Sequence, residues 1–364
     1  MIRPRVAAAV LVATALVIAG CSDDGNSGSS TTGSTAVTTR SRVRLVAPGG
    51  LRGVLDRERS ARRSSPSTST PTTVPPTTTT LPVAPFAVAQ TSATFVDTTR
   101  GSPARGGEPA QPHRTLVTTI FYPSAAPPTA EAPTPPAAPG TFPLVVFAHG
   151  YEIDAASYAT MLRDLAIGGY VVAAPDFPGT STAHPGGAIR EDALEQPADI
   201  SFVITSMLQL SEQPGLLHGV VSPTAIGVSG HSDGAVTALA AGYNTCCLDP
   251  RIKAGAILSG ATFGFDGEWF PPGTPPVMFV HATADEINGY GASVSMFDRA
   301  QSPKYLLTIE GGSHLEVFVD PPWEPQVAQA TVDFFDLYLK GDQAAAAGLA
   351  AVGNQPGFMT LQSG

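Results

Sequence analysis

The most specific fold signal in the chain is the segment Thr224-Ala-Ile-Gly-Val-Ser-Gly-His-Ser-Asp-Gly-Ala235. β-Branched residues lead into a Gly-x-Ser-x-Gly turn, and a helix-forming run follows from Ala235 to Ala241. A strand, a sharp turn and a helix in this order form the context in which the motif presents a serine nucleophile. Glycines on both sides of the serine let the two backbones approach closely. The motif therefore predicts that Ser232 lies at the carboxyl end of a strand, near the positive end of a helix dipole.

Strands and helices alternate on both sides of this turn. Strand patterns, several of them apolar runs typical of buried parallel strands, occur at 88–96, 114–122, 144–148, 170–174, 254–258, 277–281 and 305–309. Helical patterns occur at 158–167, 198–210, 291–299 and from about 326 to 339, where we expect the last element. The alternation predicts a single α/β domain with a mostly parallel central sheet and helices on both faces.

Asp285 is the predicted acid of the site. A serine hydroxyl becomes a good nucleophile when a base takes its proton and a third group orients that base. Asp285 lies in the loop just beyond the strand pattern at 277–281, downstream of the serine. Its rivals are Asp266 and Glu268, which precede that strand, and Glu286, which would take its place if the loop register differed by one.

His314 is the predicted base. It ends the loop Glu310-Gly-Gly-Ser-His314, which follows the last strand, and it is the only histidine after His281. The remaining histidines have structural interpretations. His231 occupies the variable position of the turn and is expected to pack beneath it, while His281 lies inside a strand.

Three further stretches carry a resemblance to a known family. They are Arg114-Thr-Leu-Val-Thr-Thr-Ile-Phe-Tyr-Pro123, Pro143-Leu-Val-Val-Phe-Ala-His-Gly150 and Gly169-Tyr-Val-Val-Ala-Ala-Pro-Asp-Phe-Pro-Gly179. Together with the serine, acid and histidine loops they resemble the α/β-hydrolase fold over roughly residues 88–342. They are most similar to the branch that holds dienelactone hydrolases, cutinase-like polyester hydrolases and platelet-activating-factor acetylhydrolases. Dienelactone hydrolases typically use a cysteine nucleophile, where this chain has Ser232.

The resemblance also implies an oxyanion hole, in which backbone N–H groups face the oxygen where negative charge develops. One donor is the residue after the nucleophile, here Asp233, and the other lies in the loop after the third strand, where we assign Tyr151. The Tyr151 ring is expected at the mouth of the pocket. Only eighteen residues, 259–276, separate the two strands that follow the serine, so we expect no large cap domain. No glycine-rich phosphate motif or metal cluster is evident in the sequence, and no cofactor or metal is implied.

The N-terminus predicts export. Met1 to Gly20 reads as a signal peptide, with Arg3 and Arg5 ahead of an apolar run that is short for a membrane span. Ile18-Ala-Gly-Cys21 resembles the bacterial lipobox, which implies cleavage before Cys21 and a lipid on its sulfur. The alternative is an ordinary secretory signal with an incidental cysteine. We therefore expect a lipoprotein on the outer side of the bacterial cytoplasmic membrane, or a secreted protein.

Composition divides the rest of the chain in two. Residues 21–85 are rich in Ser, Thr and Pro and predict a disordered linker, and residues 86–364 form the predicted catalytic domain. The domain has twenty-six acidic residues against ten basic ones, which argues against a nucleic-acid partner. Adjacent Cys246 and Cys247 leave three possibilities open: two thiols, a vicinal disulfide or an intermolecular link.

These features predict an exported serine hydrolase that cleaves carboxylic esters through Ser232, His314 and Asp285. Short- to medium-chain acyl esters are the expected substrates, with phospholipid and polyester esters among the candidates. An acyltransferase or a peptidase using the same three residues is the alternative enzyme. A surface binding protein on an inactive hydrolase scaffold is the non-enzymatic alternative. The sequence does not indicate the oligomeric state.

Overall fold

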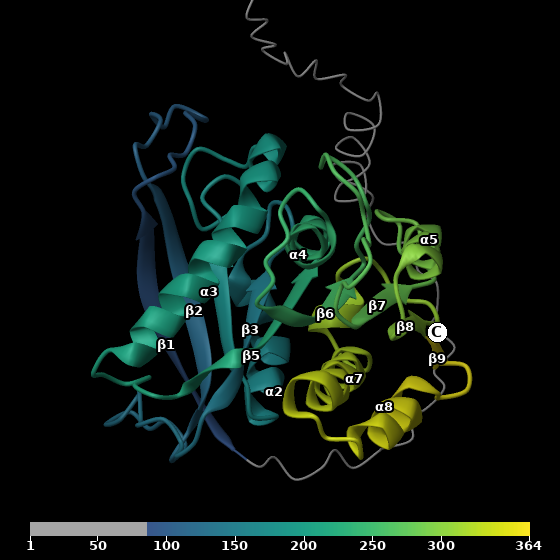
Figure 1. The fold of residues 1–364 in the computed structure, drawn as a ribbon. Coiled ribbons are helices and arrows are strands. Elements are labelled where there is room, and N and C mark those ends of the chain that lie inside the picture. Colours follow the sequence, from purple (N-terminus) through teal and green to yellow (C-terminus); the bar gives the residue numbers. More distant parts are fainter. Residues whose placement is uncertain (1–85) are drawn as a thin grey trace, which may run out of the picture. The chain divides into compact units, whose positions relative to one another are not determined.

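Six parallel strands form the middle of a nine-stranded sheet in the computed structural model, which describes residues 86–364 (Figure 1). The strand order is β1-β2-β4-β3-β5-β6-β7-β8-β9, and β3 to β8 run parallel to one another. The pairs β1–β2, β2–β4 and β8–β9 are antiparallel. The strands are β1 (Ala87–Asp97), β2 (Arg114–Ser124), β3 (Phe142–Ala148), β4 (Val171–Asp176), β5 (Val221–His231), β6 (Ile252–Leu258), β7 (Val277–Ala282), β8 (Lys304–Ile309) and β9 (Met359–Ser363).

Helices connect these strands and cover both faces of the sheet. The α-helices are α2 (Ala159–Ile167), α3 (Gln196–Glu212), α4 (Asp233–Tyr243), α5 (Gly291–Arg299), α6 (Glu316–Val319), α7 (Glu324–Phe335) and α8 (Ala345–Gly353). Two 3₁₀ helices, η1 (Ala155–Tyr158) and η2 (Arg190–Glu195), precede α2 and α3, and the π-helix η3 (Asp336–Lys340) continues α7. The predicted fold class, an α/β-hydrolase fold with a mostly parallel sheet and helices on both faces, is confirmed.

Strand β3 shows why the core has two halves. Successive side chains of a strand point to opposite faces of the sheet. Leu144 and Val146 therefore join one buried cluster, and Val145 and Phe147 join the other. All seven residues of β3 are buried, as expected of a central parallel strand with helices on both sides.

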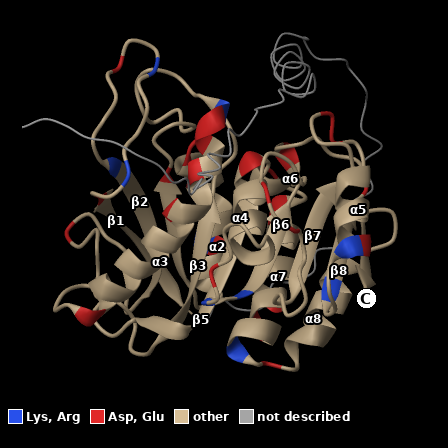
Figure 2. Ribbon diagram, turned by 45° about the horizontal axis from the view of Figure 1, so that its top comes forward, with Lys and Arg blue, Asp and Glu red and all other residues tan. Residues whose placement is uncertain are grey.

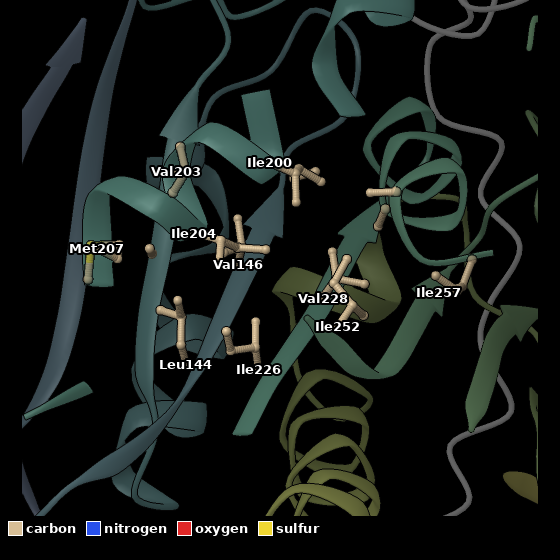
Figure 3. Close-up of a cluster of buried hydrophobic side chains, with 14 of the residues drawn as sticks. Leu144, Val146, Ile200, Val203, Ile204, Met207, Ile226, Val228, Ile252 and Ile257 are labelled. Atoms are coloured by element: carbon tan, nitrogen blue, oxygen red, sulfur yellow. The ribbon is translucent and has the colours of Figure 1, made fainter. Parts of the chain in front are cut away.

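The first cluster lies between the sheet and helices α3 and α4. Figure 3 shows Ile200, Val203 and Ile204 of α3 beside the apolar side chains of β3 and β5. Their three- and four-residue spacing places them on one face of the helix, as the sequence pattern predicted. The second cluster contains residues of α2, α6, α7 and α8.

The C-terminal part of the chain departs from the prediction. The helix predicted to be the last element is followed by α8 and by β9, which pairs with the edge strand β8. The run 345–353 is alanine- and glycine-rich without a polar face, and β9 has only five residues, so neither carries a clear periodic pattern. Both elements are stabilised by packing against β8 and α7 rather than by a local signal.

The segment between β6 and β7 is short, as expected from the sequence. Residues 259–276, between β6 and β7, contain no helix. Cys246 and Cys247, in the loop after α4, form a vicinal disulfide with an S–S distance of 2.09 Å. Within residues 86–364, no helix is both long and apolar enough to cross a membrane. The predicted signal peptide, the Cys21 lipidation site and the linker 21–85 lie outside the described residues.

Glu324, the first residue of α7, should make the free energy of unfolding depend on pH. Its side chain is buried, and burial together with the nearby Asp164 raises its pKa from an ordinary 4.5 to about 7. Between these two values the unfolded chain loses this proton while the folded chain retains it, so the free energy of unfolding falls as the pH rises. Glu324→Gln should stabilise the protein by about 1–2 kcal/mol at pH 8 and have little effect at pH 4.

Urea unfolding of both proteins across this pH range measures the effect. The exposed Glu212 at the end of α3 provides the control, and Glu212→Gln should leave the pH dependence as it is in the wild type. An equal stabilisation by Glu324→Gln at pH 4 and pH 8 would contradict the raised pKa.

Candidate active site

Ser232 lies on the turn between β5 and α4, as the motif predicts. Its backbone has φ 58° and ψ −122°, a left-handed conformation that is costly for a residue with a Cβ. The Ser232 N–H donates to the carbonyl of Leu258 on β6, and its own carbonyl accepts from the N–H of Val236 in α4. The neighbouring strand and the following helix thus hold the serine in this conformation.

The two glycines of the motif permit close contact between backbones. A Cβ on Gly230 would lie 2.3 Å from the carbonyl oxygen of Gly234. A Cβ on Gly234 would lie 2.1 Å from the carbonyl oxygen of Ala148, at the end of β3. Real Cβ atoms do not approach oxygen so closely, so the requirement for glycine at both positions is steric, as the sequence predicted.

Replacing Gly234 with alanine should therefore destabilise the fold and displace the serine. We expect a loss of about 2–4 kcal/mol in the free energy of unfolding, because the contacted atoms belong to backbone that cannot rotate away. Gly242→Ala in the same helix is the matched control, since its Cβ would meet its nearest atoms at 3.5 and 3.7 Å. Urea denaturation distinguishes the two variants, and equal midpoints would contradict the steric requirement.

His314 and Asp285 are brought together from the loops after β8 and β7. The ring atom Nδ1 of His314 lies 2.8 Å from Oδ2 of Asp285, and both side chains are almost completely buried. Because a carboxylate only accepts, Nδ1 carries the hydrogen, and Nε2 of the neutral ring is left as an acceptor. Nε2 is buried and has no hydrogen-bond partner among the described residues.

Ser232 and His314 line one cavity of about 500 Å³. Its walls come from the segment after β3, the loop after β4, the nucleophile turn and the loops after β7 and β8. The lining residues are Gly150, Tyr151, Glu152, Ile153, Ser157, Tyr158, Thr182, His231, Ser232, Glu286, Ile287, Ser313, His314 and Leu315. The cavity therefore opens onto both the serine and the histidine, which come from segments more than eighty residues apart in the chain.

The carboxylate of Asp285 accepts four hydrogen bonds. Oδ1 accepts from the N–H groups of Ile287 and Asn288, at 2.9 and 2.8 Å. Oδ2 accepts from His314 and, at 3.1 Å, from Nε2 of His281. Burial by itself would raise the pKa of Asp285, but the hydrogen bonds from His281 and His314 outweigh it and hold that pKa well below its usual range. Asp285 is thus a fixed negative charge next to His314.

His281 is a site residue to which the sequence interpretation gave only a structural position in a strand. Its Nδ1 accepts from the hydroxyl of Ser293, so that Nε2 carries the hydrogen and faces the carbonyl of Asn288 and the carboxylate of Asp285. A signal was present in the sequence, because His281 lies four residues before the acid at the carboxyl end of its strand. The strand pattern alone could not tell which face of the sheet the ring would join.

The rival acids occupy different positions. Glu286 accepts from the backbone N–H of His314 at 3.1 Å, so that it contacts the loop and not the ring nitrogen. Asp266 and Glu268 lie in the segment between β6 and β7, where the backbone of Glu268 exchanges hydrogen bonds with Thr245. Of the four carboxylates considered from the sequence, Asp285 is the one hydrogen-bonded to the His314 ring.

His231 packs beneath the turn, as predicted, and links three parts of the site. Its Nε2 donates to the carbonyl of His314 at 2.9 Å, and its Nδ1 accepts from the Tyr158 hydroxyl at 2.7 Å. That hydroxyl also accepts from the N–H of Gly150, at 3.3 Å. Burial, with a smaller contribution from His314, lowers the pKa of His231 well below its usual value, so the ring is neutral.

The two residues expected to supply the oxyanion hole lie on either side of the serine. Asp233 is the first residue of α4, where a helix has N–H groups without an intrahelical acceptor. Tyr151 lines the cavity, and its hydroxyl donates to the carbonyl of Ala188 at 3.1 Å. A Cβ on the preceding Gly150 would lie 3.3 Å from Cβ of Ser232, so this loop passes directly beside the serine. The assignment of the two N–H groups as oxyanion donors stays a prediction.

No group of three or more His, Cys, Asp or Glu side chains in the described part of the chain is arranged to hold a metal ion. His149 instead has a backbone role. Its Nδ1 donates to the carbonyl of Gly150 at 2.7 Å, and its Nε2 accepts from the N–H of Phe177 at 2.9 Å. It therefore fixes the loop that follows β3.

Known proteins match this chain in sequence and in fold. The sequence profile of the family described as Chlorophyllase matches residues 112–259, which include Tyr151 and Ser232 but end before Asp285 and His314. Chlorophyllase-1 of Arabidopsis thaliana is 29% identical over 140 residues, which are 37% of this chain. The chain spans about 40% of the length of that curated relative.

A solved structure extends the match to most of the described residues. The ferulic acid esterase of Streptomyces cinnamoneus superposes with a TM-score of 0.56 over 74% of this chain and 97% of its own, at 21% sequence identity. At that identity the likeness concerns the fold. The strand order, the nucleophile turn between β5 and α4 and this superposition agree on one architecture: the chain has the α/β-hydrolase fold.

Proposed function

We propose that the protein is a serine hydrolase that cleaves carboxylic esters with Ser232, His314 and Asp285. The observation that carries the proposal is the position of the His314 ring, whose Nδ1 is hydrogen-bonded to Asp285 while Nε2 has no partner among the described residues, in a ring that lines the same cavity as Ser232. A neutral histidine with this orientation is suited to take the proton of a serine hydroxyl. The names of the matched proteins, a chlorophyllase and a ferulic acid esterase, support an ester as the substrate.

The reaction follows from these positions. Oγ of Ser232 bonds to the carbonyl carbon as its proton passes to Nε2 of His314, and the carbonyl oxygen becomes an oxyanion facing the N–H groups of Tyr151 and Asp233. Collapse breaks the ester C–O bond, and the alcohol leaves with the proton from His314. Water then attacks the acyl-enzyme, again losing a proton to His314; the bond between Oγ and the acyl carbon breaks, His314 returns the proton to Oγ of Ser232, and the acid is released. Asp285 stays ionised and stabilises the imidazolium in both steps.

The cavity favours neutral acyl esters of short to medium chain length. A volume of about 500 Å³ is ordinary for a site that takes a small organic ligand. Its lining includes Glu152 and Glu286 and no Lys or Arg among the described residues. Figure 2 shows several acidic segments around α6, which adjoins the cavity. A negative charge on the substrate would be repelled there.

A panel of p-nitrophenyl esters tests the proposal. We expect hydrolysis of the acetate, butyrate and hexanoate, and a kcat/KM about fivefold lower for the singly charged hydrogen succinate ester than for the butyrate, with the gap narrowing in high salt. Peptide p-nitroanilides and added alcohol acceptors serve as the comparison. Cleavage of peptides but not esters, or an ester product formed with the alcohol in preference to the acid, would contradict hydrolysis of esters.

We also propose that the catalytic domain is held at the outer face of the cytoplasmic membrane by a lipid on Cys21. The support is the sequence alone, in the signal-like segment Met1 to Gly20 and the lipobox-like residues before Cys21. In a bacterial host, the full chain should incorporate labelled palmitate and fractionate with membranes, and Cys21→Ala should abolish the label. Equal labelling of the variant would contradict the assignment.

A further inference from the structure

Asp233 places a buried carboxylate directly after the nucleophile. Its side chain is 3% exposed, and its N–H is one of the two expected oxyanion donors. The tetrahedral intermediate of ester hydrolysis carries its negative charge at that donor. An uncompensated carboxylate so close, in a site shielded from water, would repel the charge that the oxyanion hole has to stabilise. A residue of this kind needs a counter-charge.

Arg190 supplies that counter-charge. Its Nη2 lies 2.7 Å from Oδ1 of Asp233, and the arginine side chain is only 10% exposed. The same guanidinium lies over the Tyr151 ring, with Cζ 5.1 Å from the ring centroid, and over the Phe263 ring at 5.8 Å. One side chain therefore contacts both residues whose N–H groups are expected to face the oxyanion.

The segment that carries Arg190 is fixed by contacts on both sides of this residue. Arg190 begins η2, and the preceding residue, Ile189, donates its N–H to the carbonyl of Gly179 at 2.7 Å. Two residues after Arg190, Asp192 pairs with the fully buried Arg114 of β2 at 2.7 Å. The position of the guanidinium is thus set by the fold and not by an exposed loop.

We propose that Arg190 is a positioning residue for the oxyanion hole. It neutralises the carboxylate of Asp233 beside the nucleophile, so that the electrostatic potential at the oxyanion is not made negative. It also holds Tyr151 in place through the face of its ring, so that both backbone N–H groups stay directed at the oxyanion. This inference rests on the proposed function, in which Ser232 forms a tetrahedral intermediate. Its effect is confined to the transition state, because neither Asp233 nor Arg190 has to contact the substrate in the ground state.

A double-mutant cycle tests the charge balance. Arg190→Gln leaves the Asp233 carboxylate uncompensated, and kcat should fall about 30- to 100-fold with KM changed less than about threefold. Asp233→Asn removes the negative charge itself, so its kcat should fall less than that of Arg190→Gln. The double variant Arg190→Gln/Asp233→Asn has neither charge, and its kcat should be at least tenfold higher than that of Arg190→Gln alone. Arg190→Lys keeps the positive charge but not the planar guanidinium group, so its kcat should lie between those of Arg190→Gln and the wild type.

An arginine–aspartate ion pair far from the site provides the matched control. Arg251 lies 2.6 Å from Asp249, just before β6 begins and so at the opposite end of the strands from the site. Arg251→Gln should leave kcat unchanged, and thermal unfolding should show that every variant is folded. A kcat of Arg190→Gln within twofold of the wild type overturns the proposal. So does a double variant that is no faster than Arg190→Gln, because the loss of kcat would then not come from the uncompensated charge of Asp233.

A second readout separates this inference from the proposed function. The rate at which a fluorophosphonate labels Ser232 depends on the same oxyanion donors but requires no ester hydrolysis. Arg190→Gln should slow labelling, and the double variant should restore it. If wild-type protein is labelled but hydrolyses no ester, the proposed function fails while the labelling rates still decide the role of Arg190. Labelling of Arg190→Gln at the wild-type rate overturns the inference whatever the substrate.

Discussion

Replacing Ser232 with alanine is expected to lower kcat for p-nitrophenyl butyrate about a millionfold, to the rate that the site supports without a nucleophile. The magnitude follows from the proposed mechanism, in which Ser232, His314 and Asp285 act as a unit. Without the Ser232 hydroxyl there is no atom for His314 to activate, and the Asp285–His314 pair has nothing to deprotonate except water in a geometry built for another nucleophile. What remains is the binding of the substrate and the oxyanion donors.

The measurement is steady-state hydrolysis by highly purified protein, paired with mass spectrometry after fluorophosphonate treatment. Ser229 offers a matched control on the preceding strand β5, since it is fully buried and lies three residues upstream of Ser232. Ser229→Ala should keep kcat within about twofold and should still be labelled on Ser232. If Ser232→Ala retained a tenth of the wild-type activity, or if the label mapped to another serine, the assignment of the nucleophile would be wrong.

Replacing Asp285 with asparagine should cost about 10⁴-fold in kcat with little effect on the fold. The backbone N–H groups of Ile287 and Asn288 would keep an amide oxygen at the position of Oδ1. The amide nitrogen would then face Nδ1 of His314, where a hydrogen-bond acceptor now lies 2.8 Å away. Two donors would meet unless the ring changed tautomer, and the other tautomer carries its hydrogen on Nε2, where it cannot accept the Ser232 proton.

Glu286 is the control for this prediction, because it is the neighbouring carboxylate and the rival acid from the sequence. Glu286→Gln keeps an oxygen to accept from the N–H of His314, so kcat should fall no more than about threefold. Comparing kcat of the two variants at pH 8 decides between them. The reverse order, with Glu286→Gln the slower enzyme, would assign the acid to Glu286.

Much of the fold is encoded in local patterns. The strand that ends in His231 and the helix that begins at Asp233 could be predicted because glycine spacing, β-branched residues and a helix-forming run lie next to one another. Six apolar strands separated by helical patterns likewise predict a parallel sheet. The elements α8 and β9 were missed because a short edge strand and an alanine-rich helix have no period of their own and depend on packing against β8 and α7.

Local sequence patterns were enough to predict the fold class and to single out Ser232 and His314 as candidates. Ser232 is marked by its own turn, and His314 by being the only histidine after the strand that carries His281. Tertiary structure alone decided which carboxylate meets the His314 ring, since Asp285 and Glu286 are adjacent and only their side-chain directions differ. It also decided that His281 donates to Asp285 and that Arg190 faces Asp233, forty-three residues away. The physical reason is that a local pattern specifies the backbone path and the buried face, whereas hydrogen bonds and ion pairs between loops depend on where distant segments meet.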